Sequence, residues 1–325
     1  MCTYNGGEFL ALQLESIAAQ TVAPDELVVC DDRSTDATLE VLERFRERAP
    51  FPVRLFVNPA TLRPAQNFAK CISLCEGDVI VLTDQDDLWF PDRVERTGEA
   101  FRSNPAATVV YSDAPLIGQQ GETLNRSIYS SLPVRAEDAE RLQRGGDLLG
   151  VLTRYSVLCG ATMAFRASLR DVALPVPQLW MHDEWIALTG NALGPAVRLP
   201  SPVMEYRQHA NQELGTGEWT VGTHLRVARA RQAEFYRAEM QRLQNGIEAV
   251  ERHPELAAVL LPLLEGKRAF CRDRLRIYTR GVRALPVLTQ LLFSGSYRRY
   301  GSGLRSSIKD FVVMIGRTLR PGAEA

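Results

Sequence analysis

The residues Asp84-Gln85-Asp86-Asp87 place three carboxylates directly after the apolar segment 78–83. Carboxylates packed at the end of a buried strand repel one another unless a divalent cation or a solvated turn compensates. A hard cation such as Mg²⁺ or Mn²⁺ binds one or two carboxylates together with phosphate oxygens, which a nucleoside diphosphate supplies. A solvated turn before a helix that begins near Pro91 explains the same residues without a ligand. The tetrapeptide alone supports both interpretations equally.

A second acidic pair, Asp31-Asp32, follows the apolar segment 26–30. Its carboxylates could accept hydrogen bonds from a base or a ribose. The residues that come next, Ser34-Thr35-Asp36, are typical of a helix N-terminus. Helix capping is therefore the alternative role of this pair.

Two later segments also carry ionisable side chains. Asp183 and Glu184 lie between large apolar residues in 180–185. Such neighbours can raise the pKa of a carboxyl group toward that of a general base, although they are as often plain core. The segment 206–212 gathers Arg207, His209 and several amides, which could bind phosphate or a metal or could form an ordinary polar loop.

The elements that would position these residues alternate along the first half of the chain. Apolar runs of strand length alternate with segments of helical period, which predicts a parallel sheet with crossover helices. The predicted strands are 26–30, 53–57, 78–83, 108–112 and 157–165, with a turn at 118–121 between extended segments. The predicted helices are one striped by Leu10, Leu14 and Ile17, one striped by Leu39, Leu42 and Phe45, and the segments 67–75 and 136–153. We expect the acidic residues to meet where open α/β sheets bind ligands, at the carboxyl ends of the strands.

The character of the chain changes after Gln212. From about Trp219 to Arg280 charged helix formers dominate, with apolar residues at helical spacing and with Pro254 and Pro262 expected to break the helix. We therefore predict an α/β domain over residues 1–215 and a helical region over 216–325.

The composition bounds the function. The 325 residues are 45% hydrophobic and 24% charged, with a formal net charge of −1, so no nucleic-acid partner is expected. The six cysteines are scattered, which favours a reducing compartment. There is neither an apolar stretch of membrane-spanning length nor a signal peptide pattern, and we expect a cytoplasmic protein.

The start of the chain is unusual. Met1-Cys2-Thr3-Tyr4-Asn5-Gly6-Gly7 has the pattern of a strand end and the turn after it, while most of the strand is absent. The sequence predicts that the first strand is truncated. We therefore expect either that the true start codon lies upstream or that the protein as given is unstable.

Taken together, these motifs resemble family 2 of the inverting glycosyltransferases with the GT-A fold, especially the bacterial rhamnosyltransferase-like branch. Order and spacing agree over residues 1 to about 215, and seven signals in the right order are far more specific than any one. The matching positions are Thr3-Tyr4-Asn5-Gly6, Asp31-Asp32-Arg33-Ser34-Thr35-Asp36, Asn67, Asp84-Gln85-Asp86-Asp87-Leu88-Trp89, Gly160-Ala161-Thr162-Met163-Ala164-Phe165, His182-Asp183 with Trp185, and Tyr206-Arg207-Gln208-His209 with Asn211.

The resemblance implies a fold and a set of roles. The fold would be α/β, with a Rossmann-like, mostly parallel central sheet flanked by helices and a helical C-terminal extension. Thr3, Tyr4, Asn5, Asn67 and either Asp31 or Asp32 would bind the nucleotide, and Arg207 would meet its diphosphate. Mg²⁺ or Mn²⁺ would be held by Asp86, with His209 and Asp84 as further metal residues. Asp84 would alternatively meet the ribose of the nucleotide or a metal-bound water. Asp183 would be the catalytic base. Glu184 is its rival, because the family often has an aromatic residue directly after the catalytic Asp, whereas here Glu184 intervenes before Trp185.

The implied reaction moves a sugar from a nucleotide diphosphate sugar, by resemblance dTDP-rhamnose, to an acceptor hydroxyl in bacterial surface polysaccharide synthesis. The acceptor would be a glycan or a lipid-linked glycan at the inner face of the cell membrane. A catalytically silent sugar-nucleotide-binding or assembly protein is the alternative.

The end of the chain has its own pattern. From Arg298 to Arg320 there are six basic residues and one acid, Asp310, with apolar residues at helical spacing. This predicts a surface-lying amphipathic helix and a peripheral membrane contact through residues 296–325. The alternative is a helix packed on the catalytic domain with a solvated basic face.

Overall fold

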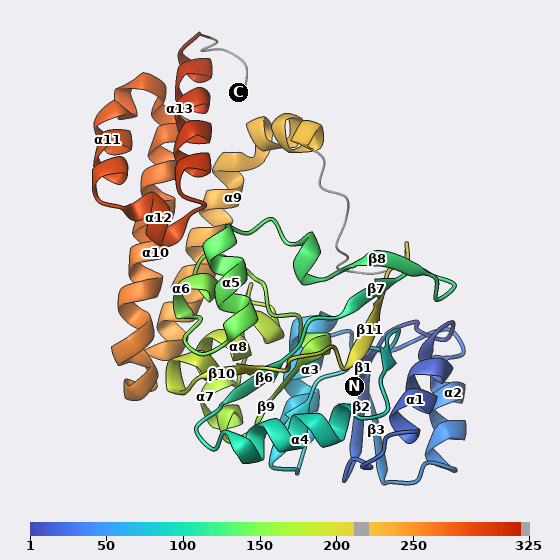
Figure 1. Ribbon diagram of the computed structural model, residues 1–325. Coiled ribbons are helices and arrows are strands. Elements are labelled where there is room, and N and C mark those ends of the chain that lie inside the picture. Colours follow the sequence, from blue (N-terminus) through green and yellow to red (C-terminus); the bar gives the residue numbers. More distant parts are fainter. Residues whose placement is uncertain (211–220, 320–325) are drawn as a thin grey trace. The chain divides into compact units, whose positions relative to one another are not determined.

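The computed structural model describes the backbone of residues 1–210 and 221–319 and the side chains of 1–210 and 232–316 (Figure 1). The chain divides into two compact units. The first comprises Met1–Leu149, Ser156–Val176 and Trp180–Thr216, and the second comprises Gly150–Tyr155, Pro177–Leu179 and Gly217–Ala325. The predicted boundary between residues 215 and 216 lies outside the described residues, so that division stays a prediction.

The first unit begins with a three-stranded parallel sheet. Its strands are β1 (Cys2–Thr3), β2 (Leu27–Asp31) and β3 (Val53–Val57), in the order β1-β2-β3. Thr3 pairs with Asp31, and Asp31 pairs with Val57. The residues that follow β1 and β2 therefore emerge at the same edge of the sheet. The strands predicted at 26–30 and 53–57 are confirmed.

Three helices alternate with these strands, namely α1 (Leu10–Ala18), α2 (Thr38–Arg46) and α3 (Arg63–Leu74). The predicted apolar stripes of α1 and α2 are confirmed, since they are buried in one core, and the two helices lie side by side in Figure 1. Helix α3 begins at Arg63, four residues before its predicted start. Pro64 suits this first turn because its missing N–H would have no intrahelical partner there.

A second sheet of four strands has the order β10-β6-β9-β4. The bounds are β4 (Val79–Val81), β6 (Val109–Tyr111), β9 (Met163–Arg166) and β10 (Ala196–Arg198). Strand β9 runs antiparallel to both β4 and β6, while β6 and β10 are parallel. The predicted strand 157–165 was too long at its start, because Gly160–Thr162 form a 3-10 turn whose Gly160 N–H bonds to Asp183.

A third sheet has the order β5-β11-β7-β8. Its strands are β5 (Leu88–Trp89), β7 (Pro115–Ile117), β8 (Thr123–Ser127) and β11 (Met204–Arg207). The antiparallel pair β7 and β8 confirms the predicted turn at 118–121 between extended segments. Strand β11 pairs with β5, which directly follows the acidic tetrapeptide, so the end of β11 is brought close to that loop.

The remaining elements of the first 210 residues are short helices. They are α4 (Arg93–Ser103), α5 (Ala136–Arg144), α6 (Leu149–Leu152), α7 (Arg170–Ala173) and α8 (His182–Leu193), with 3-10 turns at Tyr129–Ser131 and Ala167–Leu169. The continuous helix predicted over 136–153 was wrong. Gly145 and Gly146 interrupt it with φ of 73° and 87°, a left-handed backbone that ends a helix and that glycine adopts at little cost.

The described elements of the second unit after residue 220 are helical. They are α9 (Val221–Val250), α10 (Pro254–Arg280), a 3-10 turn at Gly281–Ala284, α11 (Leu285–Phe293), α12 (Ser296–Tyr300) and α13 (Leu304–Leu319). Pro254 lies in the first turn of α10 as expected, but Pro262 lies inside α10 and does not break it. Packing of α9 along α10 offsets that proline's cost. Trp219, the predicted start of the helical region, lies outside the described residues.

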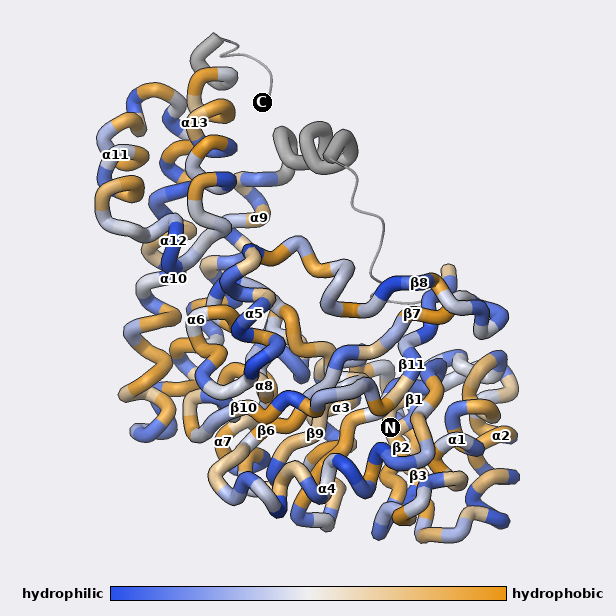
Figure 2. Tube along the Cα trace, viewed as in Figure 1, coloured by the Kyte–Doolittle hydropathy of each residue, from blue (hydrophilic) through white to orange (hydrophobic). Residues whose placement is uncertain are grey.

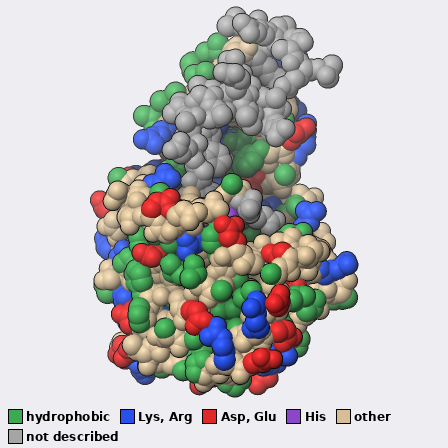
Figure 3. Space-filling view, turned by 90° about the vertical axis from the view of Figure 1, so that its right-hand side faces the viewer, with side chains coloured by type: hydrophobic (Ala, Val, Ile, Leu, Met, Phe, Trp, Pro, Cys, Tyr) green, Lys and Arg blue, Asp and Glu red, His purple; other side chains and the backbone are tan. Residues whose placement is uncertain are grey.

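Hydrophobic and hydrophilic residues alternate along the helices (Figure 2). Acidic and basic side chains are interspersed on the lower part of the face shown in Figure 3, in agreement with the net charge of −1. Within the described part of the chain, every helix is too short or too polar to span a bilayer.

Candidate functional site

A cavity of about 420 Å³ opens in the first unit where several strands end. Thr3 closes β1, Asp32 follows β2, and Asp84 lies three residues beyond β4. Seven of the predicted site residues line this cavity, namely Thr3, Tyr4, Asp32, Asn67, Asp84, Asp86 and Asp183. Side chains from the two halves of residues 1–210 thus converge at one place, as expected for an α/β ligand site.

The acidic loop after β4 holds its carboxylates in different environments. Burial, together with the charges of Asp86 and Asp183, raises the pKa of Asp84 to about 7. Asp87 is buried away from the cavity and accepts a hydrogen bond of 3.0 Å from the Arg207 backbone N–H. Burial also raises the pKa of Asp87 well above its usual range. Asp84 and Asp86 are therefore the two carboxylates of the loop that a ligand can reach.

Asp86 has a histidine partner from the C-terminal end of the unit. Its Oδ2 lies 2.8 Å from Nε2 of His209, and the His209 ring lies 4.7 Å from the ring of Phe9. His209 itself does not line the cavity. The structure places His209 as a hydrogen-bond partner of Asp86, and direct metal ligation by His209 stays a prediction.

Asp183 lies in the first turn of α8, beside the 3-10 turn that precedes β9. Its Oδ2 accepts the Gly160 N–H at 2.9 Å, and its Oδ1 accepts the Glu184 N–H at 2.8 Å. These bonds fix the carboxylate at the cavity wall. Glu184 is not among the residues that line the cavity. This geometry favours Asp183 over Glu184 as the base.

The two acids at the end of β2, Asp31 and Asp32, have different environments. Asp31 is fully buried, where it accepts hydrogen bonds from the hydroxyls of Thr3 and Ser34. Asp32 lines the cavity, and its carboxylate accepts the backbone N–H groups of Leu62 and Arg63 at 2.7 and 2.8 Å. Of this pair, Asp32 is the one placed to meet a nucleotide, while Asp31 stabilises the strand ends.

The predicted loop residues Tyr4 and Asn5 also separate. Tyr4 lines the cavity and is 53% exposed, which leaves its ring accessible to a ligand. Asn5 does not line the cavity. Its backbone adopts a φ of 47°, and its side-chain oxygen accepts the Thr35 N–H at 2.8 Å. Asn5 therefore joins the two loops that follow β1 and β2.

Asn67 lines the cavity and belongs to a buried amide network. Its Nδ2 donates to the Cys30 carbonyl at 2.9 Å, and its Oδ1 accepts a hydrogen bond of 2.8 Å from Asn58. Asn58 also donates to Asp32 at 2.8 Å. Asn67 thus anchors α3 to β2 and indirectly orients Asp32.

Arg207 binds the backbone of the acidic loop and of the turn after β7. Its guanidinium donates to the backbone carbonyls of Asp86, Gly118 and Gln119 at 2.8 to 3.2 Å. The side chain is 2% exposed and is not among the cavity residues. The geometry therefore offers no support for a contact between Arg207 and a diphosphate. It supports a role in fixing the backbone of the acidic loop.

Sequence reasoning gave no role to several residues that line the cavity, including Thr61, Arg63, Gln85, His182 and Tyr206. Arg63 is an exposed cation with a φ of 65°, and no local motif marks it. His182 is 5% exposed and stacks on Phe68 with ring centroids 3.9 Å apart. Burial lowers the pKa of His182. The motif His182-Asp183 with Trp185 marked the position of His182 but gave it no role.

The cavity carries carboxylates that could bind a divalent cation. Within residues 1–210 and 221–319, no group of three or more His, Cys, Asp or Glu side chains is placed to hold an ion by itself. Asp84 and Asp86 nevertheless lie in one cavity, and mutual repulsion contributes to the raised pKa of Asp84. Mg²⁺ and Mn²⁺ commonly take one or two carboxylates and complete their shell with water and phosphate oxygens. The residues present fit an ion that arrives together with a diphosphate.

Comparisons with known proteins agree with this geometry. The chain is 38% identical over 168 residues to a protein named glycosyltransferase EpsE of Bacillus subtilis, a match that covers 52% of the chain and 55% of EpsE. It is 24% identical over 254 residues to the dTDP-rhamnosyl transferase RfbG of Shigella flexneri, covering 76% of the chain and 84% of RfbG. The chain thus spans only about half the length of EpsE.

Solved structures show the same fold. The mannosyltransferase PcManGT of Pyrobaculum calidifontis, in complex with GDP-Man and Mn²⁺, has a TM-score of 0.50 at 18% identity, covering 98% of this chain and 86% of PcManGT. The predicted GT-A fold with a helical C-terminal region is confirmed. The family model of glycosyl transferase family 2 matches residues 1–170. Because this match covers more than half of the 325 residues, the chain belongs to glycosyl transferase family 2.

Proposed function

We propose that this member of family 2 is an inverting glycosyltransferase that moves a sugar from a nucleotide diphosphate sugar to an acceptor hydroxyl. The observation that carries the proposal is the convergence of Asp84, Asp86 and Asp183 on one cavity together with Asp32. A candidate base thus faces the same space as the carboxylates that a metal–diphosphate pair requires.

Different residues of the cavity bind the donor and activate the acceptor. Thr3, Tyr4 and Asp32 bind the nucleoside at the ends of β1 and β2. Asp183 removes the proton from the acceptor hydroxyl as that oxygen attacks the anomeric carbon. Its two backbone hydrogen bonds hold the carboxylate in one orientation during the transfer. A single displacement inverts the anomeric configuration and requires no covalent enzyme intermediate.

Asp86 and Asp84 are the residues that would hold Mg²⁺ or Mn²⁺. When bound, such an ion neutralises the charge that develops on the departing nucleoside diphosphate. His209 holds Asp86 in place through its 2.8 Å contact. Arg207 acts one step further away, because it binds the backbone of Asp86 rather than the cavity.

Similarity to known proteins is the only support for the identity of the sugar donor. RfbG is named a dTDP-rhamnosyl transferase, and this supports dTDP-rhamnose as the donor. We further propose that the acceptor is a glycan or lipid-linked glycan of a bacterial surface polysaccharide, and that the protein works in the cytoplasm at the inner face of the cell membrane.

Removal of the base tests the proposal. We expect Asp183→Asn to lower kcat by about 10²–10⁴-fold, while binding of the nucleotide diphosphate sugar changes little. Glu184→Gln is the matched control, because it removes the neighbouring carboxylate outside the cavity. Turnover can be followed as nucleoside diphosphate release from a panel of donors, with calorimetry for binding. A wild-type protein that binds a donor but never releases its diphosphate with any acceptor would instead indicate a catalytically silent sugar-nucleotide-binding protein.

A further inference from the structure

The segment from Arg280 to Leu319 has many basic residues and almost no acidic ones. It contains one acid, Asp310, and seven basic residues, Arg280, Arg283, Arg298, Arg299, Arg305, Lys309 and Arg317. Asp310 is fully buried and accepts two hydrogen bonds of 2.6 and 2.7 Å from Arg274. The hydroxyls of Tyr278 and Tyr297 also donate to Asp310. The only negative charge of the segment is therefore neutralised inside the second unit.

Helix α13 carries an exposed apolar stripe next to these basic residues. Its members are Leu304, Ile308, Phe311, Val312 and Ile315, which are 72%, 54%, 47%, 53% and 39% exposed. Spacings of three and four residues place them on one face of the helix. Another face of α13 packs inward through Ser307, Asp310 and Met314, all of which are buried. The stripe is thus the outer surface of a helix that is already anchored in its own unit.

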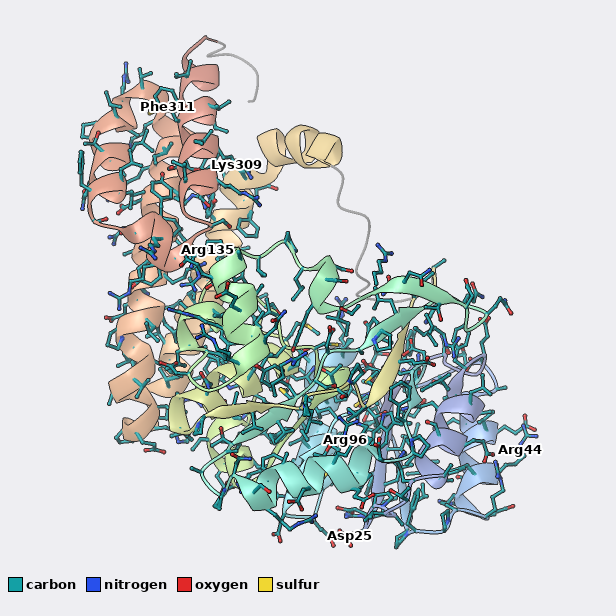
Figure 4. All side chains as sticks on the ribbon, viewed as in Figure 1. Asp25, Arg44, Arg96, Arg135, Lys309 and Phe311 are labelled. Carbon is teal, nitrogen blue, oxygen red and sulfur yellow. The ribbon has the colours of Figure 1, made fainter. Side chains whose placement is uncertain are left out.

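Basic side chains border the stripe. Arg305 and Lys309 each follow a stripe residue by one position, which places them beside it on the helix. Lys309 and Phe311 leave α13 in different directions (Figure 4). The short helix α12, which contacts α13, carries two more exposed basic residues, Arg298 and Arg299. At the end of α11, Phe293 is 88% exposed.

We propose that this stripe and its basic border bind the surface of an anionic phospholipid bilayer. Apolar side chains at helical spacing beside Lys and Arg are the pattern of a helix that lies in the membrane interface, and basic residues are attracted to an anionic leaflet. A second copy of the chain is the less favourable occupant, since it would bring two surfaces of the same positive charge together. The inference concerns the second unit and does not depend on the glycosyltransferase reaction.

Vesicle co-sedimentation of the full chain tests this proposal. The vesicles are phosphatidylcholine alone and phosphatidylcholine with phosphatidylglycerol, each at low and at high salt. The wild type is expected to bind the phosphatidylglycerol vesicles, with weaker binding at high salt. The double variant Ile308→Ser with Phe311→Ser should reduce the partition coefficient by about tenfold or more, and Lys309→Glu should weaken binding in the same direction.

Two matched variants in the first unit serve as controls. Leu12→Ser replaces a leucine on α1 that is 55% exposed, close to the 54% of Ile308, and Arg44→Glu reverses an exposed charge on α2 (Figure 4). Both should bind vesicles like the wild type. All replaced residues are exposed, so thermal melts should remain near that of the wild type.

Two outcomes would overturn the proposal. One is equal vesicle binding by the wild type and the Ile308/Phe311 variant. The other is a wild type that does not bind vesicles but forms a dimer in analytical ultracentrifugation, while the same double variant stays monomeric. The stripe would then be an interface between copies of the chain.

Discussion

At the scale of single residues, the carboxylates of Asp32, Asp84, Asp86 and Asp183 line one cavity, while the guanidinium of Arg207 binds backbone carbonyl groups outside it. A sequence alone does not show whether a cation such as Arg207 faces a cavity or a set of backbone carbonyls. The pairing of β11 with β5 and β7 determines where the Arg207 side chain lies.

Arg207 provides a test at this scale. If it supports the acidic loop, Arg207→Met removes the guanidinium hydrogen bonds to the carbonyls of Asp86, Gly118 and Gln119 and should lower the free energy of unfolding by roughly 2–4 kcal/mol. Urea denaturation measures this loss. Arg63→Met is the control, since Arg63 is an exposed cation of the cavity wall and its loss should hardly change stability. Full stability of Arg207→Met with a large loss of nucleoside diphosphate affinity would show that Arg207 serves the ligand instead.

At the scale of elements, the predictions succeeded where one local signal dominates. The helices striped by Leu10 and by Leu42 were readily recognised because their periodicity and burial agree. The predictions failed where tertiary packing decides. Pro262 is held inside α10, and the segment before Met163 is a turn because Gly160 bonds to Asp183 of another element.

Helix α8 positions Asp183 by a close approach at Gly190. A β-carbon on Gly190 would lie 2.6 Å from Val109 Cγ2 on β6 and 2.9 Å from Leu169 Cδ1. We expect Gly190→Ala to lower the free energy of unfolding by about 1–3 kcal/mol through overpacking. Gly98→Ala on α4 is the control, because its β-carbon would meet only the flexible Arg102 guanidinium within 4 Å, and it should stabilise by about 0.5–1 kcal/mol. Thermal and urea unfolding of both variants measure the change in the free energy of unfolding, which should be negative for Gly190→Ala and positive for Gly98→Ala. A stabilised Gly190→Ala would contradict the close packing.

Glu26 connects the start of β2 to the loop before β4 and gives the fold a pH dependence. Hydrogen bonds from the Glu76 and Gly77 N–H groups and the Arg54 guanidinium lower the pKa of Glu26 below 4.5. A lowered folded-state pKa contributes stability above pH 4.5 that disappears as the pH falls through the folded value. Glu26→Gln should therefore cost about 1 kcal/mol at neutral pH, and less as the pH drops below 4.5.

Urea denaturation of the wild type and Glu26→Gln over this pH range measures the difference. A difference that stays constant from neutral to acidic pH would mean that the charge of Glu26 has no part in stability.

At the scale of the whole molecule, the α/β fold followed from the alternation of elements, whereas the composition of the cavity did not. The cavity takes residues from Cys2 to Tyr206, and no window of sequence reveals that Thr61 and Arg63 face the same space as Tyr206. The resemblance to a family supplied that long-range information for the acidic residues. It supplied less for the C-terminal helices, whose outward face became apparent only from the exposure of individual side chains on α13.

The central claim is that Asp86 and a divalent cation together bind the diphosphate of the donor. Calorimetric titration of nucleoside diphosphates and their sugars, with Mn²⁺, with Mg²⁺ or with chelator, tests it on the wild type, on Asp86→Ala and on Asp25→Ala, an exposed aspartate outside the cavity (Figure 4). We expect one diphosphate to bind with metal. Chelator or Asp86→Ala should weaken this binding by about tenfold or more, and Asp25→Ala should leave it unchanged. Equal affinity with chelator and in Asp86→Ala, or no binding of any nucleotide by the folded wild type, would contradict this claim.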